Sequence, residues 1–330
     1  MVVAASASMK AVVVAKPVSL GSLKLSEIAT PTVADDGILV RVVASSANPV
    51  DLFPTTLGGY LMGGRKASVI GTDYAGVVEA VGRDVSEFRV GDEVFGGARG
   101  AFAGYISVRA GGPVVHKPAG VSFESAGAVA VAATTALQGL REHGGLEPGQ
   151  KVLINGASGG VGTFAVQIAV ALGGVVTAVC SPRNVEMVRG LGASEVIDYT
   201  RVDFTRTSER YDLIADVAGT HSLGACRRVL KPGGAYVGVG ASGVMHRRGG
   251  MLLLLGHLMR TRITSIVGSH KVVTLFIADL TKESMSFLAS LMADGRVTAV
   301  IDRRYSLGEV GAAMEYLNEG HARAKVAISV

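Results

Sequence analysis

The sequence predicts an α/β protein in which a doubly wound parallel sheet is inserted into a β-rich domain. A β-branched run leads directly into a glycine loop and a helix pattern at residues 151–172. Strand patterns alternate with helix patterns after Ser125, whereas the residues before it form β-branched runs separated by Gly, Pro and Asp. The 330 residues also exceed the usual size of one domain. These observations predict two domains with a sizeable core.

The N-terminal part is expected to be β-rich, because its β-branched runs are bounded by turn-forming residues. These runs are Lys10–Ala15, Gly37–Ser46 and Ser68–Val81. The 48% hydrophobic content and the 45 glycines suit a globular enzyme with glycine turns and do not suit a disordered or fibrous chain.

Six strands are expected in the inserted part, which is the number that two βαβαβ halves require. They are Val152–Asn155, Val175–Cys180, Glu195–Ile197, Asp212–Val217, Ala235–Val239 and Thr264–Gly268. The tail has a helix, strand, helix, strand pattern at Ser284–Ala293, Val300–Tyr305, Leu307–Asn318 and Lys325–Val330. We expect the tail to return to the N-terminal part. This assigns residues 1–127 and 272–330 to one domain, residues 128–271 to the other, and the active site to the cleft between them.

The run KVLINGASGGVG, residues 151–162, indicates a dinucleotide site. Gly156 allows a tight turn, Gly159 lets the backbone approach a pyrophosphate, and Gly162 lets helix and strand pack closely. The helix expected at Gly162–Leu172 offers its N-terminal amides to the phosphates. A purely structural glycine turn is the alternative, and the strands expected on both sides of the helix argue against it.

The end of the second inserted strand predicts which dinucleotide binds. NAD sites place an Asp or Glu about 20 residues after the loop to bind the ribose 2′-hydroxyl. This chain has Ser181, Arg183 and Asn184 there, and the next carboxylate is Glu186. Arg183 offers a planar fork to a 2′-phosphate, and Ser181 and Asn184 offer hydrogen bonds. The sequence therefore predicts NADPH; the alternative is an ordinary solvated arginine at a helix start.

The sequence pattern contains no sign of membrane insertion or secretion. No apolar run reaches the roughly 18 residues that span a bilayer. The opening residues, MVVAASAS, are too few for a signal peptide and lack its basic start. Cys180 and Cys226 are too few for a disulfide framework and are expected to be buried. We therefore expect a cytoplasmic protein.

The net charge of +5 is unevenly distributed, because residues 217–278 contain several Lys and Arg but no Asp or Glu. Such a segment can face nucleic acid or an anionic membrane. No nucleic-acid motif accompanies it, so we favour a basic rim around a cleft that receives an anionic cofactor. Its apolar run Met251–Met259, flanked by arginines, is either an interfacial membrane anchor or, as we favour, a buried helix at the substrate cleft or a dimer contact. Either role favours a hydrophobic substrate.

Several motifs, taken in order, resemble the zinc-independent branch of the medium-chain dehydrogenase/reductase superfamily, the quinone oxidoreductase type. They are SSANPVDL (45–52), VIGTDYAGVVEAVG (69–82), FRVGDEVFG (88–96), ATTALQGL (133–140), NGASGGVG (155–162), LGASEVIDY (191–199) and GHARAKVAI (320–328). The segment Val176–Tyr199 is similar to chloroplast-envelope quinone oxidoreductase homologues and plant alkenal/one oxidoreductases. The resemblance implies a Rossmann domain inserted into a GroES-like catalytic domain, a homodimer, and reduction of activated double bonds.

Zinc-using relatives in this superfamily bind catalytic zinc through a Cys in the segment aligned with SSANPVDL and a His-Glu pair in the segment aligned with GTDYAG. This chain has Asn48, Thr72 and Asp73 at those places. Without a thiolate or an imidazole, these positions do not build a tetrahedral zinc site. Zinc-dependent alcohol oxidation is therefore disfavoured. We expect a substrate that is already electrophilic, such as an enone, an enal or a quinone, with NADPH as the reductant.

Asn48 and Tyr60 are the candidate catalytic residues. Reduction of an enone leaves an enolate, which a hydrogen-bond donor must stabilise and a water or Tyr must protonate. Asn48 is the expected donor near the nicotinamide or the carbonyl, and an Asx-type turn residue is the alternative. Tyr60, in GGYLMGG, is a candidate lid residue or proton donor. Asp51 and Asp73 are expected to brace backbone amides, because a solvated Asp is ionised at neutral pH.

The resemblance also implies cofactor contacts at matching positions. Thr135 falls near the nicotinamide, and Tyr199 falls beside the adenosine phosphate. Ser158, Gly159, Gly160 and Val161 fall at the pyrophosphate. Gly240, Ala241 and Ser242 are expected to approach the nicotinamide ribose from the carboxyl edge of the sheet. In the tail the family's GHARGK appears as GHARAK, so Ala324 replaces a glycine, and Arg323 or Lys325 is expected to reach cofactor phosphate.

The leading hypothesis is an NADPH-dependent, zinc-independent oxidoreductase that reduces quinones or the C=C bond of α,β-unsaturated carbonyls by hydride transfer. One alternative is a non-catalytic NADPH-binding protein that acts as a sensor or a nucleic-acid binder. Others are a zinc-free alcohol dehydrogenase-like enzyme and a peripheral membrane enzyme that uses Met251–Met259.

Overall fold

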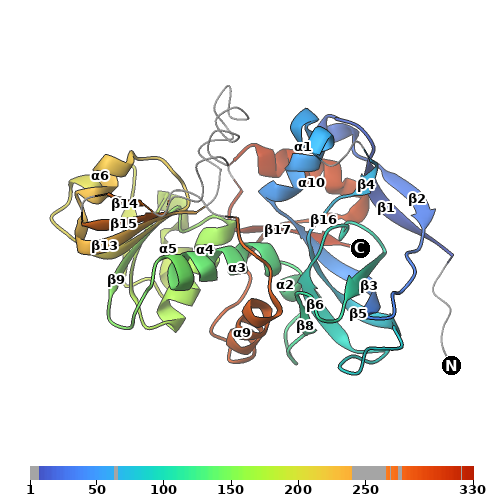
Figure 1. The fold of residues 1–330 in the computed structure, drawn as a ribbon. Helices are drawn as coiled ribbons and strands as arrows, with labels where there is room; N and C mark the ends of the chain where they lie inside the picture. The colour runs from blue at the N-terminus through green and yellow to red at the C-terminus, as the bar shows by residue number, and fades with distance from the viewer. Residues whose placement is uncertain (1–6, 63–65, 240–264, 268, 274–276, 321) are drawn as a thin grey trace. The chain divides into compact units, whose positions relative to one another are not determined.

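The computed structural model describes residues 7–62, 66–239, 265–267, 269–273, 277–320 and 322–330 (Figure 1). The chain divides into two compact units. The outer unit comprises Met1–Thr134 and Leu280–Val330, and the inserted unit comprises Thr135–Asp279. Both boundaries lie a few residues beyond the expected positions at 127/128 and 271/272.

Strands dominate the described part of the outer unit, as its β-branched runs predict. They are β1 (Ser8–Val14), β2 (Leu25–Ala29), β3 (Gly37–Ala47), β4 (Ser68–Val69), β5 (Asp73–Val81), β6 (Glu93–Gly97), β7 (Tyr105–Arg109), β8 (Val114–His116), β16 (Ile301–Ser306) and β17 (Lys325–Ser329). A small sheet has the order β2-β1-β4, and a larger one has the order β16-β17-β3-β5-β6-β8, with β7 also pairing with β3. Since β17 pairs with β3, the tail returns to the N-terminal part of the chain.

The expected strand Ser68–Val81 is interrupted at Gly71, which separates β4 from β5. Gly71 has φ of 93°, a left-handed conformation that glycine adopts without a steric penalty. A Cβ atom at Gly71 would also lie 2.6 Å from the Phe102 ring. The chain therefore turns sharply immediately before Thr72 and Asp73.

Helices and short helical turns connect these strands. In the outer unit they are η1 (Leu20–Ser22), η2 (Pro49–Thr55), α1 (Leu57–Met62), α2 (Phe123–Ala126), α3 (Ala130–Leu137), α9 (Lys282–Ala293), η6 (Leu307–Glu309) and α10 (Val310–Asn318). The boundary between the units falls inside α3. α10 packs against η1, η2 and β3, and its face toward them carries buried Val310, Ala313 and Met314.

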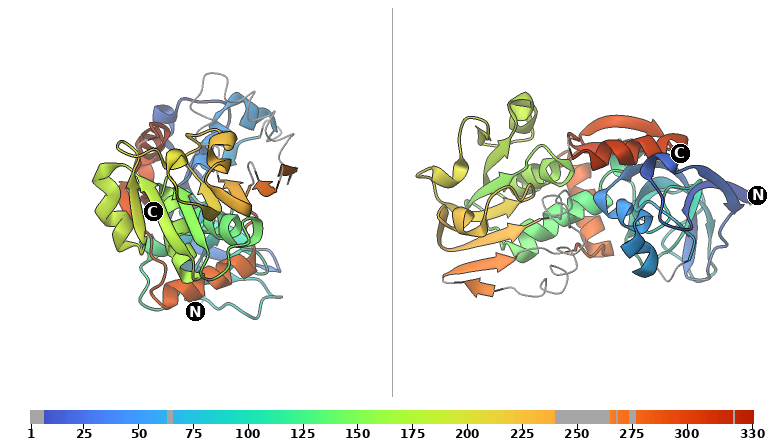
Figure 2. Two further views of the ribbon diagram at one scale, coloured as in Figure 1. Left: turned by 90° about the vertical axis from the view of Figure 1, so that its left-hand side faces the viewer. Right: turned by 90° about the horizontal axis from the view of Figure 1, so that it is seen from above.

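The inserted unit contains the doubly wound parallel sheet that the sequence predicts (Figures 1 and 2). Its strands are β9 (Lys151–Asn155), β10 (Val175–Cys180), β11 (Glu195–Asp198), β12 (Tyr211–Asp216), β13 (Leu230–Gly238), β14 (Ser265–Val267) and β15 (His270–Val273). The order across the sheet is β11-β10-β9-β12-β13-β15-β14. The chain winds one way from β9 to β11 and the other way from β12 onward, so the switch point lies between β9 and β12.

The sixth parallel strand is not the one that the sequence predicts. The expected strand Thr264–Gly268 corresponds to β14, which pairs antiparallel with β15 at the edge of the sheet. β15 itself pairs parallel with β13 and is the sixth parallel strand. The two β-branched runs lie only a few residues apart, so periodicity alone did not distinguish their directions.

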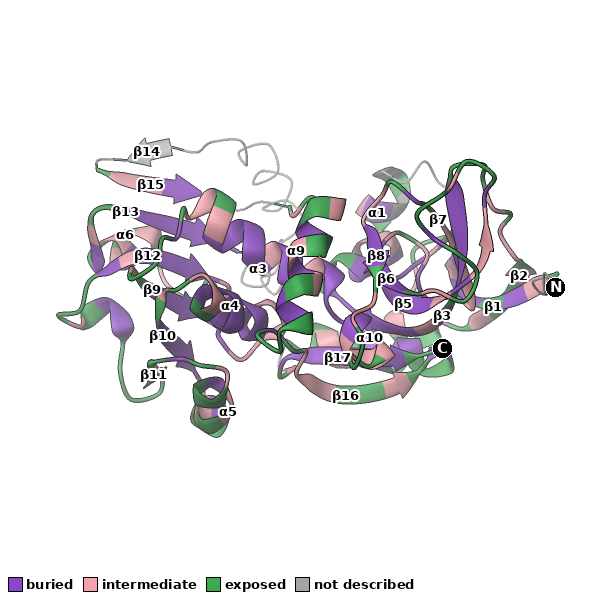
Figure 3. Cartoon of the chain, turned by 90° about the horizontal axis from the view of Figure 1, so that it is seen from below, coloured by how far each residue is buried: buried purple, intermediate pink, exposed green. Residues whose placement is uncertain are grey.

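The helical segments of the inserted unit follow its strands as a doubly wound fold requires. They are η3 (Gln138–His143), α4 (Gly160–Ala171), η4 (Pro182–Asn184), α5 (Val185–Gly190), η5 (Phe204–Arg206) and α6 (Leu223–Arg227). α4 packs on β9 and β10, and its Phe164 and Ile168 are fully buried. The central strands of the sheet are buried along almost their whole length (Figure 3). This burial explains their continuous apolar runs.

Both cysteines are free and buried, as predicted. Burial raises the pKa of the Cys180 thiol to about 11 and that of Cys226 to about 12. Among the described residues, no helix is long and apolar enough to cross a bilayer, and Met251–Met259 lies outside them.

Candidate functional site

A group of polar side chains meets where β3 ends and where β5 and β17 begin. β3 runs antiparallel to both neighbours, with Ser46 opposite Asp73 and Ala47 opposite Val326. The end of β3 therefore lies beside the starts of the other two strands. The buried polar cluster consists of Ser46, Asn48, Asp51, Thr72, Asp73 and Lys325.

Asp73 and Lys325 form the centre of this cluster. Asp73 Oδ2 accepts hydrogen bonds from Ser46 Oγ at 2.7 Å, Asn48 Nδ2 at 3.0 Å and Lys325 Nζ at 3.2 Å. Asp73 Oδ1 accepts from the Val131 amide at 2.8 Å. The side chains of Lys325 and Asp73 are 2% and 0% exposed. Buried charges are tolerated only when they are paired and hydrogen-bonded in this way.

Asp51 brings a second carboxyl group into the cluster. Its Oδ1 accepts a hydrogen bond from Thr72 Oγ1 at 2.7 Å, and its Oδ2 accepts one from the Asn48 amide at 2.9 Å. Asp51 is only 3% exposed. Burial raises the pKa of Asp51 to about 7, although the Thr72 hydrogen bond lowers it, and the neighbouring charge of Asp73 raises it further.

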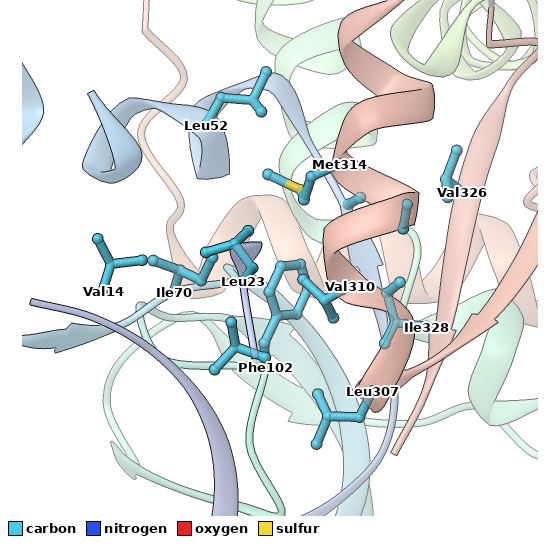
Figure 4. Close-up of a cluster of buried hydrophobic side chains, with 13 residues drawn as sticks. Val14, Leu23, Leu52, Ile70, Phe102, Leu307, Val310, Met314, Val326 and Ile328 are labelled. Atoms are coloured by element: carbon cyan, nitrogen blue, oxygen red, sulfur yellow. The ribbon is translucent and has the colours of Figure 1, made fainter. Parts of the chain in front are cut away.

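A hydrophobic core next to the cluster causes this desolvation. Ala47 precedes Asn48, Leu52 follows Asp51, and Val326 follows Lys325 along the chain. These three apolar residues belong to one buried group with Val12, Val14, Leu23, Ile70, Phe102, Leu307, Val310, Ala313, Met314 and Ile328, most of them labelled in Figure 4. The neighbouring carboxyl and ammonium groups are therefore held at the margin of an apolar core.

The structure corrects the expected role of Asn48. Its side-chain amide donates one hydrogen to the Ser46 carbonyl at 3.2 Å and the other to Asp73, and its Oδ1 accepts from Lys325 at 2.6 Å. A primary amide has two hydrogens. Both are used, and Asn48 is 2% exposed, so it has none left for a nicotinamide or a carbonyl. One of these contacts is local, to Ser46, and the other two join Asn48 to Asp73 and Lys325, so Asn48 is a structural member of the buried polar cluster.

Two further expectations at this cluster need correction. Arg323 or Lys325 was expected to reach cofactor phosphate, and the structure removes Lys325 from this choice, because its ammonium group is buried against Asn48 and Asp73. Asp51 and Asp73 do brace backbone amides, of Asn48 and Val131 respectively. The premise that Asp51 is solvated is wrong, however, because the adjacent core excludes water from it.

The cluster does not fit a zinc ion. Where zinc-using relatives have a Cys and a His-Glu pair, this chain has the amide of Asn48, the hydroxyl of Thr72 and the carboxylate of Asp73. The carboxylate of Asp73 and the amide oxygen of Asn48 both accept hydrogen bonds from the Lys325 ammonium group. Among the described residues, no group of three or more His, Cys, Asp or Glu could hold a metal ion. The positive charge that these oxygen atoms contact is therefore the Lys325 ammonium group, and they are not available as ligands to a zinc ion.

The glycine loop of the inserted unit has the geometry of a phosphate cradle. Gly156 has φ of 86°, and a Cβ there would approach Ala218 at 3.0–3.1 Å. A Cβ on Gly162 would lie 2.1 Å from the Gly156 carbonyl, which permits the close approach expected of it. A Cβ on Gly159 would meet only that same carbonyl, at 3.5 Å, so its open side remains available to a ligand. α4 begins immediately after Gly159, and its first amides lack intrahelical partners.

Ser181, Arg183 and Asn184 gather at the end of β10, as predicted. Asn184 is 3% exposed, its Nδ2 donates to Ser181 Oγ at 3.0 Å, and its Oδ1 has no hydrogen-bond partner. A buried acceptor without a partner fits a ligand that donates to it. The Arg183 side chain is exposed, and Glu186 pairs with Arg189 on α5.

Sequence spacing missed one carboxylate at this edge. Asp198 ends β11 directly opposite Cys180, the last residue of β10. It lies 18 residues after Cys180 in the sequence, and the strand register places the two residues side by side. Its Oδ1 accepts from the Thr200 amide at 2.9 Å and the Thr200 hydroxyl at 2.7 Å.

A second missed group lies at the switch point of the sheet. Asp216 ends β12 and accepts from Asn155 Nδ2 at 2.8 Å, the Gly219 amide at 2.8 Å and Tyr236 OH at 2.9 Å. Asn155 ends β9 immediately before the glycine loop and also contacts Thr220 at 3.2 Å. The signal available in the sequence was a polar residue at the end of each of two neighbouring strands. This network ties the glycine loop to the loop after β12.

The remaining predicted residues divide between the two units. In the inserted unit, Ser158, Gly159, Gly160 and Val161 are partly exposed at the start of α4, Thr135 is partly exposed on α3, and Tyr199 is 58% exposed. In the outer unit, Arg323 is exposed and its amide donates to Asp302. Tyr60 lies in α1, and its side chain is outside the described residues. Gly240, Ala241 and Ser242 also lie outside the described residues.

Comparison with known proteins gives consistent matches over the whole chain. Residues 34–119 match the alcohol dehydrogenase GroES-like domain, and residues 191–328 match a zinc-binding dehydrogenase family. The chain is 32% identical over 326 residues to 2-methylene-furan-3-one reductase of Solanum lycopersicum, covering 94% of this chain and 76% of that protein. It is 31% identical to Quinone-oxidoreductase QR1, chloroplastic, of Triphysaria versicolor, covering 93% of each.

The fold matches solved structures as well. The structure of the quinone oxidoreductase from Coxiella burnetii superimposes with a TM-score of 0.81 at 27% identity. The match covers 98% of this chain and 99% of that one.

Proposed function

The chain belongs to the medium-chain dehydrogenase/reductase family, quinone oxidoreductase type, and on this premise we propose that it is an NADPH-dependent reductase of quinones or of the C=C bond of α,β-unsaturated carbonyls. That it is an oxidoreductase follows from the family. The choice of NADPH and the substrate class are the proposed part.

The arrangement at the end of β10 carries the proposal of NADPH. Arg183 is exposed beside Ser181, where a 2′-phosphate would find a guanidinium fork and a hydroxyl group, and Asn184 holds that hydroxyl through its side-chain amide. Asp198 stands near this edge, but two hydrogen bonds from Thr200 satisfy its Oδ1. We therefore expect a preference for NADPH rather than complete exclusion of NADH.

The glycine loop and the start of α4 would hold the pyrophosphate. Gly159 leaves room for it, and Gly156 and Gly162 permit the turn and the close packing that shape the loop. The helix dipole favours its negative charge. When bound, the nicotinamide supplies a hydride, and the protein supplies orientation and electrostatics.

The donor set of the buried polar cluster supports the proposed substrate class. Because the cluster does not fit zinc, we expect a substrate that is electrophilic without Lewis-acid activation. Enones, enals and quinones meet this requirement. The name of the tomato relative, 2-methylene-furan-3-one reductase, describes a C=C bond conjugated to a ketone, which supports the same class.

Steady-state oxidation of NADPH with a panel of enones, enals and quinones tests this function, with EDTA present throughout. We expect turnover of at least one conjugated electrophile, unaffected by EDTA, and slower turnover with NADH. Tight NADPH binding with no turnover would instead favour a non-catalytic NADPH-binding protein. Complete loss of activity in EDTA would overturn the zinc-independent proposal.

A further inference from the structure

One member of the buried polar cluster reaches the protein surface. Ser46, Asn48, Asp51, Asp73 and Lys325 are between 0% and 3% exposed, whereas Thr72 is only partly buried. Thr72 follows the left-handed turn at Gly71, and its hydroxyl contacts Asp51 at 2.7 Å. Thr72 therefore links the buried carboxyl group of Asp51 with the outside of the cluster.

The charges in the cluster make Asp51 the carboxyl group that keeps a proton. The cluster has two carboxyl groups and one ammonium group, and the ammonium pairs with Asp73. Among the described residues, Asp51 makes no ion pair, and the charged groups acting on it are Asp73 and Lys325. An unpaired charge in a buried site is unfavourable. A proton on Asp51 leaves one carboxylate and one ammonium group in the cluster, so that its net charge is zero.

We propose that Asp51 and Thr72 deliver the proton that completes reduction of a conjugated double bond, with Thr72 as the catalytic residue that touches substrate and Asp51 as the proton reservoir behind it. This inference rests on the proposed function.

The proton passes from Asp51 through Thr72 to the α-carbon of the substrate. Hydride addition at the β-carbon moves the C=C electron pair toward the carbonyl and leaves an enolate. The α-carbon of the enolate takes the Thr72 hydroxyl proton, and Thr72 Oγ1 takes the carboxyl proton of Asp51. Asp51 is left as a carboxylate and regains its proton from water. The oxidised partner is the nicotinamide, and the reduced product is the saturated carbonyl compound.

The direction of the hydrogen bond between Thr72 and Asp51 explains how the proton reaches the substrate. With Asp51 ionised, the Thr72 hydroxyl donates inward to Asp51 Oδ1. With Asp51 protonated, the carboxyl group donates to Thr72 Oγ1, and the hydroxyl hydrogen points elsewhere. Since the Asp51 backbone and the Asn48 amide hold the carboxyl group in place, only the proton has to move.

Other groups nearby are less suited to donate. Each oxygen of Asp73 accepts at least one hydrogen bond, and Ser46 and Lys325 are buried. Tyr74 is buried, and that burial raises its pKa far above neutral.

The proposal is tested by enone reduction in D₂O. The intact wild-type protein is compared with Thr72→Val, Thr72→Ser and Asp51→Asn, and kcat and the stereochemistry of the α-deuterium in the product are measured. We expect Thr72→Val to lower kcat by about 100-fold, as loss of a positioned proton donor does. The α-deuterium of its product should become stereochemically mixed, because water then supplies the proton from either face. Thr72→Ser keeps the hydroxyl and should restore both rate and stereochemistry. We expect wild type to lose activity as pH rises through neutrality, and Asp51→Asn should remove this pH dependence.

Thr55→Val is the matched control. It removes a hydroxyl from η2 that bonds only the Leu52 carbonyl in the described contacts, at 2.7 Å, and it should change neither rate nor stereochemistry. Unchanged α-stereochemistry and rate in both Thr72→Val and Asp51→Asn would overturn the proposal.

A measurement without cofactor or substrate separates the two ideas. Carbon-13 NMR titration of the labelled aspartates should show one carboxyl group that loses its proton near neutral pH in wild type and is missing in Asp51→Asn. A carboxyl group of Asp51 that is fully ionised at pH 5 would overturn the inference even if the enzyme reduces enones. If wild type reduces no electrophile, the proposed function fails, and the titration still decides where the proton resides.

Discussion

Lys325 Nζ lies 3.2 Å from Asp73 Oδ2, with both side chains almost completely buried. Removing the cation leaves a buried carboxylate without a counter-charge, which typically costs about 3–5 kcal/mol. We expect Lys325→Met to lower the free energy of unfolding by about this amount in urea denaturation. Lys151→Met, which breaks the exposed pair with Glu209, should have a small effect by comparison. Equal effects of the two substitutions would contradict the buried ion pair.

Asp51 should make the free energy of unfolding decrease as pH rises, which is the opposite of the usual effect of a carboxyl group. Its pKa is raised to about 7 in the folded protein, from the ordinary value of 3.8 for an aspartate. The folded state therefore binds more protons than the unfolded state between these values, and wild type loses stability as pH rises through this window. Asp51→Asn lacks this ionisation, so its stability relative to wild type should increase from about pH 4 to about pH 7 and then level off. Thermal melts at several pH values measure the difference.

Glu309 provides a control of opposite sign. Hydrogen bonds from the Ser306 side chain and backbone lower the pKa of Glu309. Its contribution to stability is therefore present at neutral pH and is lost as pH falls through the lowered pKa. Glu309→Gln should be less stable than wild type at neutral pH, and the difference should shrink in acid. Parallel pH trends for the Asp51 and Glu309 variants would show that the Asp51 trend has another cause.

Ala324 occupies a conformation that suits glycine. Its φ is 62°, and it is 3% exposed immediately before Lys325. An alanine in this region carries a strain of roughly 1–2 kcal/mol, which glycine does not. This relief offsets the lost methyl burial and the greater freedom of the unfolded chain, so Ala324→Gly should change stability little. Ala313→Gly, inside α10, should destabilise by about 1 kcal/mol or more in the same denaturation assay.

Gly159 and Gly162 should respond differently to the same substitution. Gly159→Ala meets no close contact, so the protein without cofactor should keep its melting temperature. The added methyl group would occupy space that the backbone offers to a pyrophosphate, and NADPH binding should weaken at least about tenfold. Gly162→Ala should lower the melting temperature itself, because its Cβ would lie 2.1 Å from the Gly156 carbonyl. Fluorescence titration and thermal melts distinguish the two effects.

Arg183 should determine cofactor preference. A charge-assisted hydrogen bond is worth about 1.5–3 kcal/mol, so Arg183→Ala should weaken NADPH binding by roughly 10- to 100-fold. NADH binding should change little, because it has no 2′-phosphate. Arg206→Ala removes an equal charge that pairs with Asp203 and should leave the preference intact. Equal losses for NADPH and NADH on Arg183→Ala would show that Arg183 does not recognise the 2′-phosphate.

The sequence predicted the elements that depend on local pattern. The strand at 175–180, the helix after the glycine loop and the tight turn at Gly156 all appear where the sequence places them, and Gly156 makes its turn with a positive φ. The polar group at the end of β10 was predictable for the same reason, since Ser181, Arg183 and Asn184 are neighbours in the chain. Local periodicity and turn residues decide such features within a few residues.

The buried polar cluster was beyond this kind of prediction. The sequence predicts a free donor at Asn48, because nothing near it in the chain shows that Lys325, 277 residues later, donates a hydrogen bond to its side-chain oxygen. Asp198 was missed for a similar reason, because only the pairing of β10 with β11 places it opposite Cys180.

The sequence by itself determined the family, the two-part architecture and the dinucleotide loop, because each depends on the order and spacing of residues along the chain. Only the tertiary structure decided the ionisation of Asp51 and the partners of Asn48. A pKa depends on burial and on charges that are close in space. Strand register and the packing of an apolar core set both, and they bring together side chains from the two ends of the chain.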